Sequence, residues 1–166
     1  MNLEEAIKMA LDYENRVRDA YKDAAAKAKD DVGKRVFSVL GDEEQRHVEY
    51  LEGKLAEWRQ NGKVTPEELD TIVPSEDAIA RGVEKLNHHL SKADRGSEME
   101  LLSKALQLEV ETSNFYQKMV NELGDEGKLF ERFLEIEKGH QAIVQAEMDY
   151  ANQTGYLFDF QDFGMV

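Results

Sequence analysis

Apolar residues recur every three or four positions along four long stretches of this chain, which is the spacing of one face of an α-helix. The first stretch predicts a helix over residues 3–29, and after a tight turn at 30–33 a second helix continues to about residue 60. A third helix is predicted from about residue 97 to a turn at 124–125, and a fourth from that turn to about residue 152. The pattern therefore predicts two helical hairpins.

A long connection separates the two hairpins. It covers residues 61–96, opens with a typical helix stop at Asn61-Gly62, and contains both prolines of the chain. A short helix is predicted within it at about 75–90. A connection of this length can run along a bundle and return the chain to its starting end. The sequence therefore predicts an all-α fold over residues 1–153, a ferritin-like four-helix bundle of two antiparallel helix hairpins joined by a long crossover. Residues 154–166 are predicted to form an aromatic tail that packs on the bundle or on a partner subunit.

Each apolar face carries polar residues near its middle. They are Glu14 on the first helix, Glu44 and His47 on the second, Glu109 on the third, and Glu137 and His140 on the fourth. Burying an unpaired carboxylate is costly, so such groups are normally paired, hydrogen-bonded or bound to metal. Two divalent cations would neutralise four carboxylates while the histidines stay neutral. This charge balance favours a dimetal site over a buried hydrogen-bond network, and an empty or vestigial site is the alternative.

These polar positions also lie level with one another along the predicted bundle. Residues 14 and 44 are centred on residue 29, beside the first turn, and residues 109 and 137 on residue 123, beside the second. In an antiparallel hairpin, residues equidistant from the turn share a height. The remaining offset of two or three residues is roughly 3–5 Å at the helical rise, which side chains can span.

The two hairpins resemble each other in sequence. Tyr21 and Tyr116 each follow the first Glu of their hairpin by seven residues, and Phe37 and Phe130 each precede a Glu-x-x-His motif by seven. A lone Glu-x-x-His motif is weak evidence in an acidic chain, so the matched placement carries the prediction. The repeat predicts pseudo-twofold packing that brings both ligand sets to one centre.

Charge and composition narrow the function classes. The net charge of −14 argues against a nucleic-acid partner, because phosphates require clustered Lys and Arg. The chain has no cysteine and so can form no disulfide, zinc ribbon or Cys-ligated iron site. No apolar run reaches the roughly 20 residues that span a bilayer, and the first residues lack the features of a signal peptide. We expect a cytoplasmic protein that binds neither nucleic acid nor membrane.

This arrangement resembles the ferritin-like superfamily and, within it, the rubrerythrin-like proteins. The resemblance covers both hairpins and extends to residues 154–160, which are similar to the aromatic segment after the fourth helix of many members. It implies a pair of iron ions, although manganese suits the same carboxylate–imidazole set. The resemblance further implies that Glu14 and Glu109 are terminal ligands, that Glu44 and Glu137 bridge the metals, and that His47 and His140 each give one nitrogen.

The resemblance also implies an activity. Such proteins reduce hydrogen peroxide to water, or use dioxygen or peroxide to oxidise ferrous iron. We therefore expect a di-iron oxidoreductase, a rubrerythrin-like peroxidase or ferroxidase, acting on peroxide or dioxygen, and the resemblance implies a homodimer. An iron-binding or iron-storage module and a metal-free structural bundle are the alternatives.

Two features depart from the family pattern. Typical rubrerythrins carry a rubredoxin domain that supplies electrons, and a chain without cysteine must instead use a separate electron-donor protein. They also carry an extra Glu one turn after the third-helix ligand, where this chain has Thr112; the neighbouring Glu111 points about 100° away. The departure at Thr112 speaks against redox-linked ligand switching and favours a ferroxidase-like role.

Two tyrosines and two further histidines are also candidates for the site. Tyr21 and Tyr116 lie two helical turns beyond the terminal ligands, where they can hydrogen-bond ligand carboxylates or pass electrons, or can simply be buried tyrosines with an acceptor. His88 and His89 lie in the crossover without a Glu three residues earlier, and are predicted to be surface or packing residues.

The remaining acids and aromatics are interpreted as solvated or packing residues. Glu43, Glu111 and Glu147 are candidates for supporting the ligands or admitting cations, but are interpreted as solvated helix acids. A cluster in the tail is predicted to cap the bundle or to join a subunit interface; its members are Phe158, Phe160 and Phe163.

Overall fold

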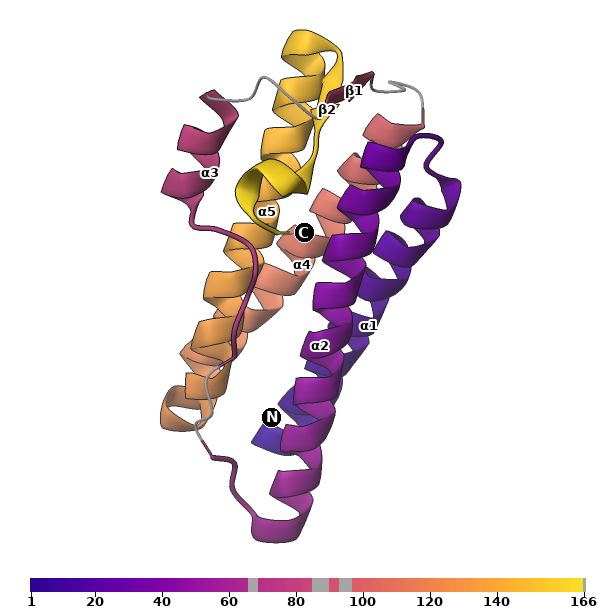
Figure 1. The fold of residues 1–166 in the computed structure, drawn as a ribbon. Coiled ribbons are helices and arrows are strands. Elements are labelled where there is room, and N and C mark those ends of the chain that lie inside the picture. The colour runs from indigo at the N-terminus through magenta and orange to yellow at the C-terminus, as the bar shows by residue number, and fades with distance from the viewer. Residues whose placement is uncertain (66–68, 85–89, 93–96, 166) are drawn as a thin grey trace.

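Helices account for most of the residues that the computed structural model describes, which are 1–65, 69–84, 90–92 and 97–165. Four of the helices are long: α1 (Leu3–Lys27), α2 (Asp31–Asn61), α4 (Glu98–Leu123) and α5 (Lys128–Thr154). α1 and α2 form one antiparallel hairpin, α4 and α5 form the other, and α1 packs against α4 (Figure 1). The all-α prediction is confirmed.

The described residues of the crossover between the hairpins form one short helix and one strand. Helix α3 (Glu76–Glu84) packs against α5, and strand β1 (Leu90–Lys92) pairs antiparallel with β2 (Tyr156–Phe158) of the tail. The helix predicted over 75–90 is therefore wrong at its end, because Leu90 is in a strand opposite Phe158. Three-residue strands with distant partners leave no periodic signal in the sequence.

Side-chain caps decide where the helices begin. Asn2 and Glu5 form a reciprocal capping box at α1, and the Asp30 carboxylate accepts the Gly33 N–H at 2.8 Å. Because of the second cap, residues 31–33 already form the first turn of α2, and the tight turn predicted at 30–33 is wrong there. The second hairpin turns through a short 3-10 helix, η1 (Gly124–Gly127), instead of a turn at 124–125 alone.

Two apolar clusters fill the two ends of the bundle. One contains Val17, Leu40 and Leu102, and the other contains Ile7, Leu51 and Phe133. The tail joins the first cluster, because Phe158 and Phe160 are fully buried there and β2 contacts both α2 and α5. A short 3-10 helix, η2 (Phe160–Phe163), follows β2. Between the clusters the bundle holds a band of buried polar side chains.

No helix in the described part of the chain combines the length and the apolar composition that crossing a bilayer requires.

Candidate metal centre

The six polar residues predicted on the apolar faces meet in the band between the two clusters. All six side chains are fully buried: Glu14, Glu44, His47, Glu109, Glu137 and His140. Their ligand atoms form two groups of four, and within each group the atoms lie within 4.8 Å of one another. Glu14, Glu44, His47 and Glu137 make the first group, and Glu44, Glu109, Glu137 and His140 make the second. Since Glu44 and Glu137 belong to both groups, the geometry suits two ions with these carboxylates between them.

Each histidine turns its Nδ1 atom toward the carboxylates. Nδ1 of His47 lies 3.2 Å from Glu44 Oε2 and 3.4 Å from Glu137 Oε1. Nδ1 of His140 lies 2.7 Å from Glu44 Oε1 and 3.3 Å from Glu109 Oε1. The two imidazole rings are nearly parallel, with an interplanar angle of 17° and centroids 5.5 Å apart. One nitrogen from each ring is therefore available on the carboxylate side, one for each group.

Several buried oxygens in the band have no hydrogen-bond partner. Both oxygens of Glu137 are in this state, and so is one oxygen each of Glu14, Glu44 and Glu109. Buried polar atoms without partners are costly and rare. Metal ions would supply the missing partners, and a set of carboxylates with one imidazole per ion suits iron or manganese. The residues therefore fit a pair of divalent ions.

Electrostatic coupling within the band is strong. Burial, together with the charges of neighbouring carboxylates, raises the pKa of Glu44 and of Glu137 well above the ordinary value. Burial opposes the charged form of His47, yet the nearby Glu44 and Glu14 raise its pKa to about 10. Protons thus compensate the crowded carboxylates when no cation is bound. Cations must displace these protons to bind.

Two tyrosines cross between the hairpins to reach the acids. The Tyr21 hydroxyl on α1 donates to Glu109 Oε1 on α4 at 2.7 Å, and the Tyr116 hydroxyl on α4 donates to Glu14 Oε1 on α1 at 2.7 Å. Burial raises the pKa of both tyrosines well above the ordinary value, so both hydroxyls keep their protons. Each hydroxyl thus contacts a candidate ligand, which fits both a supporting role and the alternative of a buried tyrosine with an acceptor.

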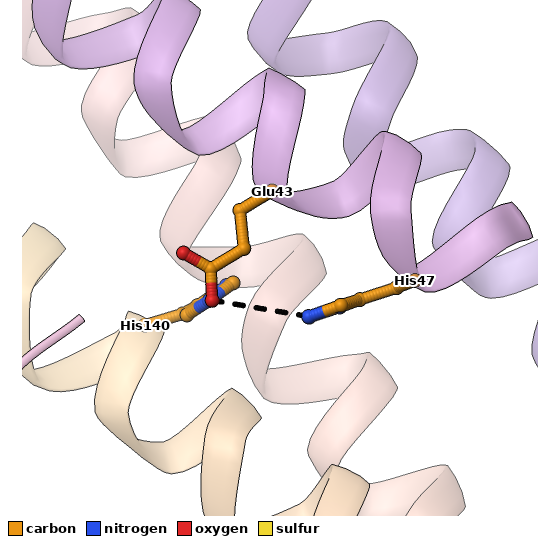
Figure 2. A group of neighbouring side chains, drawn as sticks. All are labelled: Glu43, His47 and His140. Carbon is orange, nitrogen blue, oxygen red and sulfur yellow. Dashed lines mark ion pairs between the residues drawn. The ribbon is translucent and has the colours of Figure 1, made fainter. Parts of the chain in front are cut away.

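Glu43 is buried beside the histidines, so its interpretation as a solvated helix acid is wrong. Its side chain is fully buried, and its Oε1 lies 3.2 Å from His140 Nε2 and 3.9 Å from His47 Nε2. Figure 2 shows the carboxylate reaching from α2 to both imidazoles. Burial alone would raise the pKa of Glu43, but His140 and the Thr71 hydroxyl lower it below the ordinary value. The signal in the sequence was its position four residues before His47, which places both side chains on one face of the helix.

The other predicted supporting acids differ in exposure. Glu111 is exposed, as interpreted, whereas the solvated reading of Glu147 is wrong because its side chain is fully buried. Glu147 lies under the tail, where it accepts the Phe158 N–H at 2.9 Å. Thr112 is buried and donates its hydroxyl to the Leu108 carbonyl at 2.8 Å. The predictions for His88 and His89 lie outside the described residues.

Comparisons of this chain with protein-family models, with curated proteins and with solved structures found no match. The geometry of the buried residues is therefore what defines the class of site, a candidate dimetal-carboxylate centre within a helical bundle.

Proposed function

We propose that this protein is a non-haem di-iron oxidoreductase that reduces hydrogen peroxide or dioxygen, with a rubrerythrin-like site in a ferritin-like bundle. The observation that carries the proposal is the pair of overlapping ligand groups that share Glu44 and Glu137. Two hairpins contribute matching sets, each with a Glu, a Glu-x-x-His motif and a supporting tyrosine. Such constellations hold two metals in helical bundles.

The chemistry divides between the ions and the chain. When bound, the two ferrous ions supply one electron each, and with two protons these convert one hydrogen peroxide into two water molecules. The carboxylates neutralise the ions in a medium where an unpaired charge is costly. Tyr21 and Tyr116 hold Glu109 and Glu14 in place through short hydrogen bonds. The apolar clusters at either end keep bulk water from the site. Repeated turnover would require a separate electron-donor protein, because the chain has no cysteine with which to build a rubredoxin-type iron site.

A ferroxidase role is the second candidate, and the residue that favours it is Thr112. Its hydroxyl is engaged by its own helix at the Leu108 carbonyl, so α4 contributes one acid, Glu109, to the two ligand groups. Helix α4 thus lacks the extra Glu that typical rubrerythrins, which reduce peroxide, carry at this position. In this version, incoming ferrous iron is the substrate: each ion gives one electron to dioxygen or peroxide, which is reduced with uptake of protons, and the iron leaves as ferric product.

Metal analysis and rapid kinetics on one preparation distinguish these roles. Protein loaded anaerobically with ferrous iron should hold about two ions per chain. It should consume peroxide in the presence of a reductant faster than free iron does. Faster reaction with dioxygen than with peroxide, together with iron uptake well beyond the two sites, would favour the ferroxidase.

Two variants make the experiment specific. Glu137→Gln removes a residue common to both ligand groups, and Glu111→Gln makes the same chemical change at an exposed position of α4. We expect Glu137→Gln to lose both metal and turnover, and Glu111→Gln to retain both. Wild-type protein that holds no metal, or that turns over no faster than free iron, would sink the proposal.

A further inference from the structure

Both nitrogens of each buried histidine face a carboxylate, but on opposite sides of the ring. The Nδ1 atoms face the candidate ligands, as described above. The Nε2 atoms face Glu43, whose Oε1 is 3.2 Å from His140 and 3.9 Å from His47 (Figure 2). Glu43 therefore lies across the imidazoles from the metal positions, and cannot reach an ion held by Nδ1 without displacing a ring.

From this geometry we propose that Glu43 is a positioning residue shared by both histidines. Both Nε2 atoms are buried without a hydrogen-bond partner, and Glu43 is the carboxylate that would accept a hydrogen bond from each Nε2–H and so leave both Nδ1 lone pairs free for metal. The bond to His47 requires the present 3.9 Å separation to shorten. A neutral imidazole carries one N–H and one lone pair, and the partner of the N–H decides which nitrogen binds the ion. An ionised carboxylate has acceptor positions for two donors. The inference rests on the proposed function, since it assigns a role toward the same pair of ions.

The remaining contacts of Glu43 suit this role. Its other oxygen, Oε2, is buried without a hydrogen-bond partner, so the carboxylate has capacity left for the second histidine. Oε2 lies 3.9 Å from Nη2 of Arg46, on a half-exposed side chain, and Oε1 faces the two imidazoles. The single carboxylate of Glu43 would fix the tautomer of both imidazoles, of which His47 belongs to the first ligand group and His140 to the second.

The crossover holds Glu43 from the outside. The Thr71 hydroxyl donates to Glu43 Oε1, and Thr71 Oγ1 in turn accepts the Val73 N–H at 3.1 Å. A chain of contacts therefore runs from the crossover backbone through Thr71 and Glu43 to the histidines. The crossover thereby takes part in shaping the metal centre, in addition to connecting the hairpins.

A third cation between Glu43 and the histidines is the competing reading, since the three residues bring ligand atoms within 4.8 Å of one another. Such an ion would need the Nε2 lone pair of each ring while Nδ1 binds another ion. Each imidazole would then have to give up its only N–H proton. A hydrogen-bond acceptor requires no such loss, and is the role that the chemistry favours.

Cobalt(II) provides a probe with two independent readouts. Its affinity can be measured by competition with a chelator, and its paramagnetism shifts the NMR signal of each coordinated histidine's N–H, which disappears in D2O. Wild-type protein should bind two cobalt ions per chain and show one such signal for each histidine. In Glu43→Gln, an amide donor replaces one oxygen, so we expect both signals to move and the affinity for both ions to fall about 10–100-fold.

Two further variants control the measurement. Asp42→Asn makes the same change of charge at the exposed neighbouring position and should leave affinity and signals as in the wild type. Thr71→Val removes the crossover hydroxyl with little change in volume, and should reproduce the shift of both signals in smaller measure. If Glu43→Gln fails to fold, the Thr71→Val variant still tests the inference.

The outcomes separate this inference from the proposed function. Wild-type protein that binds no cobalt would overturn both. Two ions in the wild type with unchanged signals and affinity in Glu43→Gln and Thr71→Val would overturn the role of Glu43 alone. An effect confined to one ion and one histidine would contradict the shared role, and three cobalt ions per wild-type chain would establish the third cation in its place.

Discussion

At the scale of single residues, the tyrosines that cross between the hairpins carry one prediction. Tyr21→Phe and Tyr116→Phe each remove one 2.7 Å hydrogen bond to a candidate ligand carboxylate while keeping the ring in the core. The carboxylate then loses a charge-assisted contact that orients it. We expect each variant to fold, to hold both ions, and to bind them about tenfold more weakly. Chelator competition with manganese measures this, and Tyr156→Phe at an exposed position is the control. Unchanged affinity in both core variants would show that these tyrosines serve packing alone.

Glu147 carries a prediction about pH. Its burial raises the pKa well above its ordinary value, so the folded state holds the proton more tightly than the unfolded state. This contribution to stability is complete below about pH 4.5 and is lost as the pH rises through the folded-state pKa. Gln in place of Glu147 cannot ionise and can still accept the Phe158 N–H. Glu147→Gln should therefore unfold at a higher temperature than the wild type, with a difference that grows from pH 5 to pH 8.

Thermal unfolding monitored by circular dichroism at several pH values checks this prediction. A difference of a few degrees is expected, because about 1 kcal/mol shifts the Tm of a domain of this size by about 2–4 °C. Glu111→Gln, at an exposed site on α4, should show no comparable trend. A Tm gap for Glu147→Gln that is independent of pH would mean that this carboxyl does not titrate differently in the two states.

At the scale of elements, the turn between α4 and α5 depends on a glycine. A Cβ on Gly127 would lie 2.9 Å from the Met119 carbonyl oxygen and 3.4 Å from the Val120 Cα, both backbone atoms that cannot yield easily. Gly127→Ala should therefore destabilise the protein by about 1–3 kcal/mol, as overpacking usually does. Gly53 on the exposed face of α2 has no atom within 4 Å of such a Cβ.

Gly53→Ala is accordingly the matched control for this turn. Alanine costs less conformational entropy than glycine in a helix, so this variant should be stabilised by about 0.5–1 kcal/mol. Urea denaturation of the two variants gives both values. Equal effects of the same sign would contradict the assignment of a close approach at Gly127.

At the scale of the whole molecule, metal ions would join the two hairpins. Each ligand group takes residues from both: Glu137 of α5 completes the group on the first hairpin, and Glu44 of α2 completes the group on the second. Manganese at about 100 times its Kd should therefore stabilise the folded state by about 2.7 kcal/mol for each bound ion, which corresponds to roughly 5–10 °C in Tm per ion.

Differential scanning calorimetry with and without a chelator measures this linkage. The stabilisation should decrease as the pH falls below about 10, because the ions must displace protons held by His47, with its pKa of about 10, and by Glu44 and Glu137. Glu44→Gln should lose most of the effect. A Tm that is the same with manganese and with chelator would argue for the metal-free structural bundle.

The sequence by itself determined the helical faces and the positions of the six polar residues on them. Periodicity is a local property, because a side chain's direction around a helix follows from its residue number alone. The internal repeat added the pairing of the faces and so predicted that both ligand sets meet at one centre, whereas the bridging positions of Glu44 and Glu137 were implied only by the family resemblance. The same local rules located the ends of α1 and α2 only to within a few residues. The start of α2 depends on a single hydrogen bond, from the Gly33 N–H to the Asp30 carboxylate.

Tertiary structure alone decided what covers the other faces. Glu43 is adjacent to Glu44 and points about 100° away from it, so its burial depends on Thr71 of the crossover and His140 of α5. Glu147 is buried by the tail, and β1 finds its partner in β2, in each case through contacts between segments far apart in the chain. Periodicity shows which way a residue points on its helix, whereas its solvation depends on the segment that packs over it.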